Sequence, residues 1–353
     1  MSSLKTKTAI FLKTKHIGDS IILTSAISAL PNEYKYIDVV CLSESNDIFE
    51  MNPRVRNIFV IPRDLHGLKK AKNYMVILRK IISYKYDLLI QFSGDWRGAF
   101  LSRLLNVELS VAGKTVRRGY IWHKSFDVIA NLPDSKRHRV EQDLDLLRKA
   151  GLFNKAEAPP YKIIAPKFNI RKISKWLLEN KAPKQKKTIV IHAASRWTFK
   201  EIPISTWVEL IQSLKINNFN VILSGSNGDL KFNNFIYQAC KLKPILTKDF
   251  SLFDTSALYK LSDLVVTIDS MSAHLASALQ VPVVAIFGPT NEKNWAPWKV
   301  KYKVIALSET DNPSLSCRPC GQDGCGGSKV SHCLTLVSSK MILNESLKIL
   351  RIY

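Results

Sequence analysis

The feature that most constrains the fold is an alternation of short apolar runs with helical stretches, which occurs twice along the chain. In the first half, strand-like runs cover residues 8–13, 37–42, 58–61 and 88–92. A helix is expected from Asp19 to Leu30, where Pro31 stops it. Strands that alternate with helices indicate a parallel sheet covered on both faces.

A second series of the same design begins after a proline-rich and lysine-rich stretch. Its strands are expected at residues 188–192, 220–224, 264–268 and 283–287, with helices between them, the first at residues 204–216. A chain of 353 residues is longer than one compact core usually holds. We therefore expect one α/β domain at 1–165, a linker region with one helix in it at 166–187, a second α/β domain at 188–335 and a C-terminal helix at 336–353.

The charge balance favours partners that carry phosphate or other anions. Lys and Arg number 52 against 29 Asp and Glu, a net charge of +23. Such an excess attracts nucleic acid, an anionic membrane face or a phosphorylated substrate, and charge alone does not choose among them. No apolar run approaches the roughly 18 residues that span a bilayer, so we expect a cytoplasmic protein.

Open parallel sheets bind ligands where strands end and helices begin, and three such turns carry polar residues. The first is Lys15-His16-Ile17-Gly18-Asp19. Asp19 is interpreted either as the N-cap of the following helix or as a carboxylate general base, and the segment alone favours the cap.

The second turn, residues 192–200, reads His-Ala-Ala-Ser-Arg-Trp-Thr-Phe-Lys after an apolar strand. Its small residues and Ser195 allow close approach to a phosphate, and Lys200 could supply a cation to a diphosphate. A surface lysine is the alternative for Lys200.

The third turn, Asp269-Ser270-Met271-Ser272-Ala273-His274, starts a helix whose free amides would form an anion site. Thr290, which follows Phe287-Gly288-Pro289, is a further candidate phosphate ligand. The alternatives are an N-cap by Asp269 or Ser272 and a core role for His274.

The order of these turns resembles the heptosyltransferase family of glycosyltransferases, glycosyltransferase family 9. The resemblance rests on Gly18-Asp19 in the first turn, on His192-Ala-Ala-Ser195 followed by Lys200-Glu-Ile-Pro203, and on Asp269-Ser270 with His274. The run Phe287-Gly-Pro-Thr290 completes it. The cysteine-rich segment from Cys317 to Cys333 resembles the subgroup called heptosyltransferase III.

The resemblance implies a GT-B architecture, in which two Rossmann-like domains face each other across the active-site cleft. Residues 1–165 would bind the acceptor and residues 188–335 the ADP-sugar, and the C-terminal helix at 336–353 would pack back on the first domain. It implies inverting transfer of L-glycero-D-manno-heptose from ADP-heptose to the inner core of lipopolysaccharide, with no metal or other cofactor. The acceptor would be the second heptose, which gains a branching third heptose. Met271 replaces a glycine and His192 a proline of the family's pattern, and both positions belong to the implied donor site.

The resemblance also implies roles for individual residues. Asp19 would be the base and Lys200 would stabilise the leaving group. The implied donor residues are Ser195, Asp229, Phe250, Asp269, Ser270, Met271, Ser272, His274 and Thr290. The implied acceptor residues are Lys69, Lys70, Arg97, His138 and Arg139.

Four of the six cysteines form the spacing C-x2-C-x4-C-x7-C at Cys317, Cys320, Cys325 and Cys333. A C-x2-C pair is a metal-ligand signature, and the spacing alone leaves zinc open. Because related enzymes resembling this one carry similar cysteines without a recognised metal, we expect a buried cysteine cluster and no metal.

Two other classes of protein remain as rivals. A basic nucleic-acid-binding protein fits the charge, but no helix-turn-helix, zinc-finger or RNA-binding signature is present. A nicotinamide-dependent dehydrogenase would carry a GxGxxG fingerprint, which is absent. A family member that transfers another nucleotide-activated sugar also stays open. We expect no nucleic-acid partner and a peripheral location on the cytoplasmic face of the inner membrane, and the sequence leaves the oligomeric state open.

Overall fold

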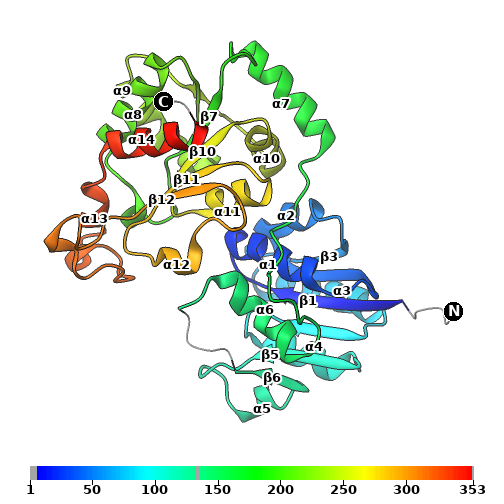
Figure 1. Cartoon of the computed structure of the whole chain (residues 1–353). Helices are drawn as coiled ribbons and strands as arrows, with labels where there is room; N and C mark the ends of the chain where they lie inside the picture. Colours follow the sequence, from blue (N-terminus) through cyan, green and yellow to red (C-terminus); the bar gives the residue numbers. More distant parts are fainter. Residues whose placement is uncertain (1–5, 132–135, 352–353) are drawn as a thin grey trace. The chain divides into compact units, whose positions relative to one another are not determined.

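The computed structural model describes residues 6–131 and 136–351, and the chain divides into two compact units, Met1–Ile164 and Ala165–Tyr353. Each unit contains one six-stranded sheet in which every strand pair is parallel (Figure 1). The expected α/β fold class is therefore confirmed. Among the described residues, the apolar helices all fall short of the length that crossing a bilayer requires.

The first sheet has the strand order β3-β2-β1-β4-β5-β6. Its strands are β1 (Lys7–Lys13), β2 (Tyr34–Leu42), β3 (Val55–Ile61), β4 (Leu88–Gln91), β5 (Leu109–Gly113) and β6 (Val128–Ala130). The helices of this domain are α1 (Ile17–Ala29), α2 (Asn46–Glu50), α3 (Gly67–Ile82), α4 (Trp96–Leu104), α5 (Tyr120–His123) and α6 (Arg139–Lys149).

Helices cover both faces of the first sheet because its strands are apolar on both sides. On one face Ile81 of α3, Leu101 of α4 and Trp122 of α5 pack on the sheet. On the other face α1 packs against α2 and α6. Burying this apolar surface is the main contribution to stability, at about 25 cal/mol per Å².

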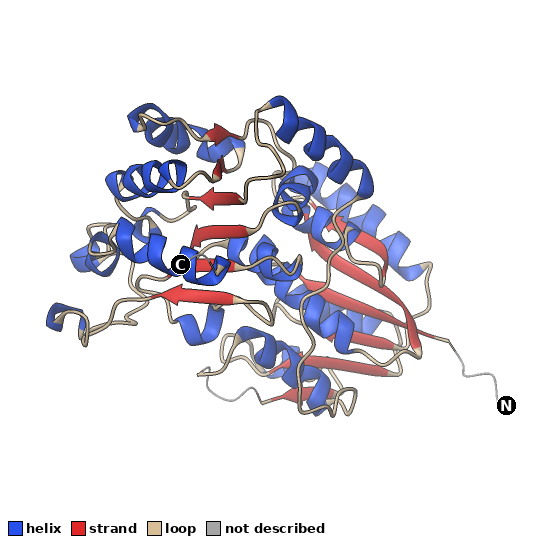
Figure 2. Cartoon of the chain, turned by 45° about the horizontal axis from the view of Figure 1, so that its top comes forward, coloured by secondary structure: helices blue, strands red, loops and turns tan. Residues whose placement is uncertain are grey.

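The second sheet repeats the design with the order β12-β11-β10-β7-β8-β9. Its strands are β7 (Thr188–His192), β8 (Asn220–Ser224), β9 (Ile245–Leu246), β10 (Leu264–Ile268), β11 (Val283–Ile286) and β12 (Tyr302–Ile305). Its helices are α7 (Lys167–Glu179), α8 (Ile204–Ile216), α9 (Leu230–Ala239), α10 (Leu252–Lys260), α11 (Met271–Ala278), α12 (Glu292–Trp295), α13 (His332–Thr335) and α14 (Ser339–Leu350). Helices again flank the strands on both sides (Figure 2).

Two segments differ from their expected places. The proline-rich stretch expected as a linker with one helix does contain that helix, α7, but the helix packs on α10 within the second unit. The C-terminal helix was expected on the first domain, but α14 packs against α8 and β12 of the second sheet. Its Ile342 and Ile349 belong to that domain's hydrophobic core, and this apolar face explains the placement.

Candidate functional site

The strand order places the switch point of each sheet at one pair of strands. In both sheets the order reverses at two central strands, β1 and β4 in the first domain and β7 and β10 in the second. Ligands of doubly wound sheets bind beyond the carboxyl ends of such a pair. All three turns singled out from the sequence follow one of these four strands, which makes them the candidate site of each domain.

Asp19 does not cap its helix, so the interpretation favoured by the segment alone is wrong. Helix α1 begins at Ile17 with His16 as its N-cap residue, and Asp19 is the third helical residue. Its side chain is 15% exposed, and Oδ1 lies 3.9 Å from Nζ of Lys13. A carboxylate that is free of a capping bond and close to a cation is available for proton transfer.

Lys13 is the last residue of β1, and its side chain is fully buried. Its Nζ donates a 2.7 Å hydrogen bond to Asp143 of α6, which also accepts from Arg139 at 2.9 Å. Burial raises the pKa of Asp143, but the charges of Lys13 and Arg139 outweigh it and lower that pKa below its ordinary value. The sequence analysis missed Lys13 and Asp143, although a lysine directly after four apolar strand residues was a signal.

The turn after β4 is tied to the turn after β1. Asp95 is the N-cap of α4, accepting from the backbone N–H of Arg97 at 2.9 Å and from its guanidinium at 3.0 Å. The hydroxyl of Thr14 also donates to Asp95, and the backbone N–H of Thr14 donates to Ser93 at 2.7 Å. Arg97 therefore lies at the switch point of the first domain, as an acceptor residue would require.

The other expected acceptor residues fall in different places. His138 is the N-cap of α6, where its Nδ1 accepts from Val140 at 3.2 Å. Arg139 follows it and joins the Lys13 network through Asp143. Lys69 and Lys70 lie in the first turn of α3, the crossover helix from the edge strand β3 to β4. Tyr74 of the same helix lies under the guanidinium of Arg97, 6.0 Å from its ring centroid.

In the second domain, Lys200 and Asp269 form an ion pair of 2.5 Å across the switch point. Lys200 ends a short 3-10 helix (Thr198–Lys200) in the loop after β7, and Asp269 directly follows β10. Their side chains are 20% and 10% exposed, so the pair lies at the rim of the domain rather than in its core. In the same loop, the hydroxyl of Ser195 accepts from the backbone N–H of Trp197 at 3.1 Å.

Helix α11 begins beside this pair. Its N-cap is Ser270, whose hydroxyl accepts from the N–H of Ser272 at 3.3 Å, so the alternative caps Asp269 and Ser272 are wrong. Met271 is the first helical residue and is half-buried. His274 is buried on this helix with its ring edge-on to Trp295 at 6.4 Å.

Three further expected donor residues follow neighbouring strands. Asp229 accepts from Ser226 in a capping box that begins a 3-10 helix after β8. At Gly225, in the same loop, a Cβ atom would lie 2.6 Å from Asn233, so the backbone approach requires glycine. Phe250 stacks edge-on against Trp176 with ring centroids 4.9 Å apart, and Thr290 is half-buried after β11.

Buried polar atoms without a hydrogen-bond partner also mark this edge of the second sheet. Nδ1 of His192 and Oγ1 of Thr247 are buried and unpartnered among the described residues. His192 ends β7 and Thr247 directly follows β9. Burial lowers the pKa of His192, although the charge of Asp229 opposes that shift, so the imidazole is held neutral. Thr247 was missed by the sequence analysis and has no sequence signal.

Comparison with known proteins identifies the family. Residues 75–320 match the profile of glycosyltransferase family 9 (heptosyltransferase). The chain belongs to glycosyltransferase family 9. It is a glycosyltransferase, and the family resemblance noted in the sequence is confirmed.

A curated relative of this glycosyltransferase is the Escherichia coli lipopolysaccharide heptosyltransferase 3, 26% identical over 80% of this chain and 83% of the relative. Two solved structures share its fold over 98% or more of both chains. They are a family 9 glycosyl transferase from Veillonella parvula (17% identity, TM-score 0.84) and the E. coli ADP-heptose lps heptosyltransferase II (17% identity, TM-score 0.78). These likenesses support the expected GT-B fold class.

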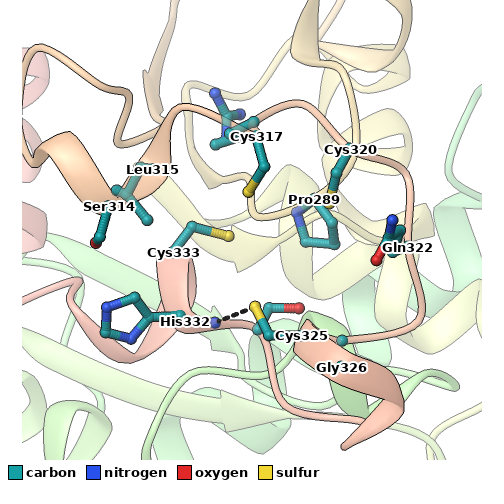
Figure 3. Close-up of a pocket in the computed structure, with 13 residues that line it drawn as sticks. Pro289, Ser314, Leu315, Cys317, Cys320, Gln322, Cys325, Gly326, His332 and Cys333 are labelled. Carbon is teal, nitrogen blue, oxygen red and sulfur yellow. Dashed lines mark hydrogen bonds between the residues drawn. The ribbon is translucent and has the colours of Figure 1, made fainter.

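The cysteine-rich segment of this family 9 enzyme lines a pocket of about 410 Å³ in the second domain (Figure 3). Cys333 is buried, whereas Cys317, Cys320 and Cys325 are exposed, so the expected buried cluster is wrong for three of the four. All four thiols are free, and Cys325 accepts a 3.4 Å bond from the N–H of His332. Within residues 6–131 and 136–351, no group of three or more His, Cys, Asp or Glu is arranged to hold a metal ion.

Proposed function

We propose that this glycosyltransferase moves L-glycero-D-manno-heptose from ADP-heptose to the inner core of lipopolysaccharide, adding the branching third heptose. Membership of family 9 supports heptose transfer. The names of the relatives support the rest, because one is a lipopolysaccharide heptosyltransferase 3 and another an ADP-heptose lps heptosyltransferase II. The observation that carries the donor assignment is the Lys200–Asp269 pair at the start of α11.

The second domain offers the groups that a departing diphosphate requires. The ammonium of Lys200, held by Asp269, would face the developing negative charge on ADP. The hydroxyls of Ser195 and Thr290 and the first backbone amides of α11 add neutral donors. Asp229 and Phe250 follow β8 and β9, and we assign them to the ribose and the adenine.

The first domain offers the base. In the proposed step, the acceptor hydroxyl transfers its proton to Asp19 while its oxygen forms a bond to the anomeric carbon. The bond from that carbon to the diphosphate oxygen breaks, and ADP leaves with the electron pair. Because the attack and the departure occur on opposite faces, the anomeric configuration inverts. Arg97 and Arg139 would bind acidic groups of the core near Asp19.

Helix α3 supports a peripheral contact with an anionic membrane face, which we place on the cytoplasmic side. Its sequence GLKKAKNYMVILRKII carries five basic residues and no acidic one. Leu68, directly before the first lysine, is 90% exposed, and Met75, between Lys72 and Arg79, is 51% exposed. Basic residues interleaved with exposed apolar side chains suit an anionic lipid surface. Lys69 and Lys70 would then guide the lipid-linked acceptor to the enzyme.

The proposed chemistry uses only protein donors and needs no metal. Lys200 and the α11 amides supply the positive potential that a divalent cation would otherwise supply. We therefore expect an excess of EDTA to leave the transfer rate unchanged. A rate that falls with EDTA and returns with an added metal would contradict this part of the proposal.

The deciding experiment is ADP release from ADP-L-glycero-D-manno-heptose, with and without lipopolysaccharide truncated after its second heptose. Release that depends on this acceptor, together with one heptose of added mass, would establish the donor and the acceptor class. Stabilisation by ADP without transfer would redirect the search to other acceptors. Thermal stabilisation of the protein by UDP or GDP in place of ADP would favour transfer of another nucleotide-activated sugar. Met271, which replaces a glycine of the family's pattern at the start of α11, is the reason to test this alternative.

A further inference from the structure

The most unusual charge in the first domain is the ammonium of Lys13, whose side chain is fully buried at the end of β1. A buried ammonium is unfavourable unless anions compensate it. Two carboxylates do so: Asp143 at 2.7 Å, through a direct hydrogen bond, and Asp19 at 3.9 Å. Asp143 also pairs with Arg139 at 2.9 Å, and Asp19 is the second carboxylate within 4 Å of the buried ammonium.

The surroundings of Asp19 contain more positive than negative charge. From β1 and the loop after it come Lys13 and Lys15, and from α6 come Asp143 and Arg139. Burial and the charge of Lys13 together lower the pKa of Lys15, although Asp19 and Asp143 oppose the shift. The buried Tyr161 lies within electrostatic reach of Asp143. Asp19 is thus held against a fixed positive field that other parts of its own domain create.

We infer that Lys13 and Asp143 are positioning residues for the base: Asp143 fixes the buried ammonium, and the ammonium fixes the carboxylate of Asp19 at the end of β1. This inference rests on the proposed role of Asp19. It gives the pair a function beyond joining α6 to the sheet. A carboxylate held in one orientation need not be ordered when the acceptor binds, which lowers the barrier for proton transfer.

The pair must be removed as a unit, because deleting one partner leaves an uncompensated charge in the core. The double variant Lys13→Met/Asp143→Asn removes both charges, and Arg139 keeps its 3.1 Å bond to Gln142. A matched control is Arg56→Met/Asp38→Asn. Asp38 is also fully buried and bonds to Arg56 at 2.7 Å, but it lies opposite Ile10, three residues before the end of β1.

We expect the double variant to lower kcat by roughly 10- to 100-fold, with the KM for the sugar nucleotide unchanged within about twofold. The control pair should leave kcat unchanged at a similar loss of thermal stability. In an Asp19→Asn background, the double variant should cause no further loss of residual transfer, since its effect acts through Asp19. Asp143→Glu, which keeps both charges but displaces the carboxylate by one methylene, is the second variant should the double one not fold. Its loss of kcat should vanish in the same background.

Two outcomes would overturn the inference: a kcat equal to that of the control pair, or the same fractional loss with and without the Asp19 carboxylate. If Asp19→Asn itself turned over like the wild type, the base assignment would fail and this inference with it. If Asp19→Asn were inactive while the double variant behaved as the control, only the positioning role would fail.

Discussion

The two domains share a strand order but manage charge differently at their switch points. In the first domain, Lys13 and Asp143 are almost fully buried, and a third charge, Asp19, lies close to them. In the second, Lys200 and Asp269 pair at the rim, beside the first amides of α11 and neutral hydroxyls. The first arrangement keeps its paired charges inside the domain, and the second leaves the ammonium of Lys200 partly exposed.

This difference fits the different tasks of a base and of a phosphate site. A base must be held in one place and one orientation, which buried partners enforce. A diphosphate site must accept a charged ligand and release it, which rim-exposed cations and backbone amides permit. The same fold therefore serves both tasks through the residues placed at the ends of two central strands.

The largest expected effect comes from replacing Asp19, the proposed base of the first domain. Asp19→Asn should lower transfer by about 10²- to 10⁴-fold, the usual contribution of a general base, while ADP binding stays unchanged. Steady-state kinetics and ADP titration measure the two effects. Asp47→Asn is the matched control, because Asp47 also lies in the first turn of a helix of this domain. Wild-type turnover in Asp19→Asn would remove Asp19 from the mechanism.

The corresponding test in the second domain is Lys200→Met. We expect transfer to fall by about 10²- to 10³-fold, because the cation that faces the leaving diphosphate is lost. Weaker ADP binding, measured by calorimetry, should accompany the fall. Lys348→Met is the control: its 2.7 Å ion pair with Glu345 lies in the same domain on α14, which packs against α8 and β12. Equal losses of transfer activity in the two variants would show that Lys200 has only a structural role.

The third prediction concerns the effect of added salt on the KM for the acceptor. Raising ionic strength about tenfold shortens the screening length by about threefold, so the acceptor KM should rise several-fold if basic residues bind an anionic core. Lys69→Gln/Lys70→Gln should raise that KM and flatten its salt dependence. Lys184→Gln/Lys186→Gln, which removes two exposed lysines from the second domain, should do neither. A KM that is insensitive to salt would contradict the electrostatic interpretation.

The smallest expected effect is a difference in acid stability. Burial lowers the pKa of His192 below 6.5, so the unfolded protein binds a proton at this residue at a higher pH than the folded protein does. The contribution of His192 to the free energy of unfolding is therefore complete above pH 6.5 and decreases as the pH falls below that value. The pKa of Asp143 is lowered from 3.8, so its contribution is complete above 3.8 and is lost only in stronger acid.

Melting temperatures of the wild type and His192→Gln, measured at several pH values between 7.5 and 5.5, test the histidine. The advantage of the wild type should shrink as pH falls through this range. A constant difference between the two proteins would show that His192 is not held neutral in the folded state. Asp143→Asn should show no such change in this range.

Much of the second domain was readable from the sequence. The expected strands at 188–192, 220–224 and 264–268 and the helix at 204–216 match β7, β8, β10 and α8 residue for residue. Each is a regular apolar run with a clear boundary, such as Pro203 before α8. By contrast β6 has three residues and β9 two, too few for a period to be recognised.

Several site residues could also be named in advance, because they follow strands in sequence. Asp19, Lys200 and Asp269 all lie in turns after the central strands. Their local roles were harder to predict. Whether the helix begins after His16 or after Asp19 depends on the backbone conformation of residues 17–19. The preference of Asp for N-caps gave the wrong choice.

The sequence by itself determined the two α/β series, the turns that hold the chemistry and the family resemblance, because these follow from local periodicity and from motifs of a few residues. Only the tertiary structure decided that Lys13 is buried against Asp143, 130 residues further along the chain, and that α14 packs on its own domain. Such contacts join segments far apart in sequence, and their energies depend on burial and packing that no local pattern encodes.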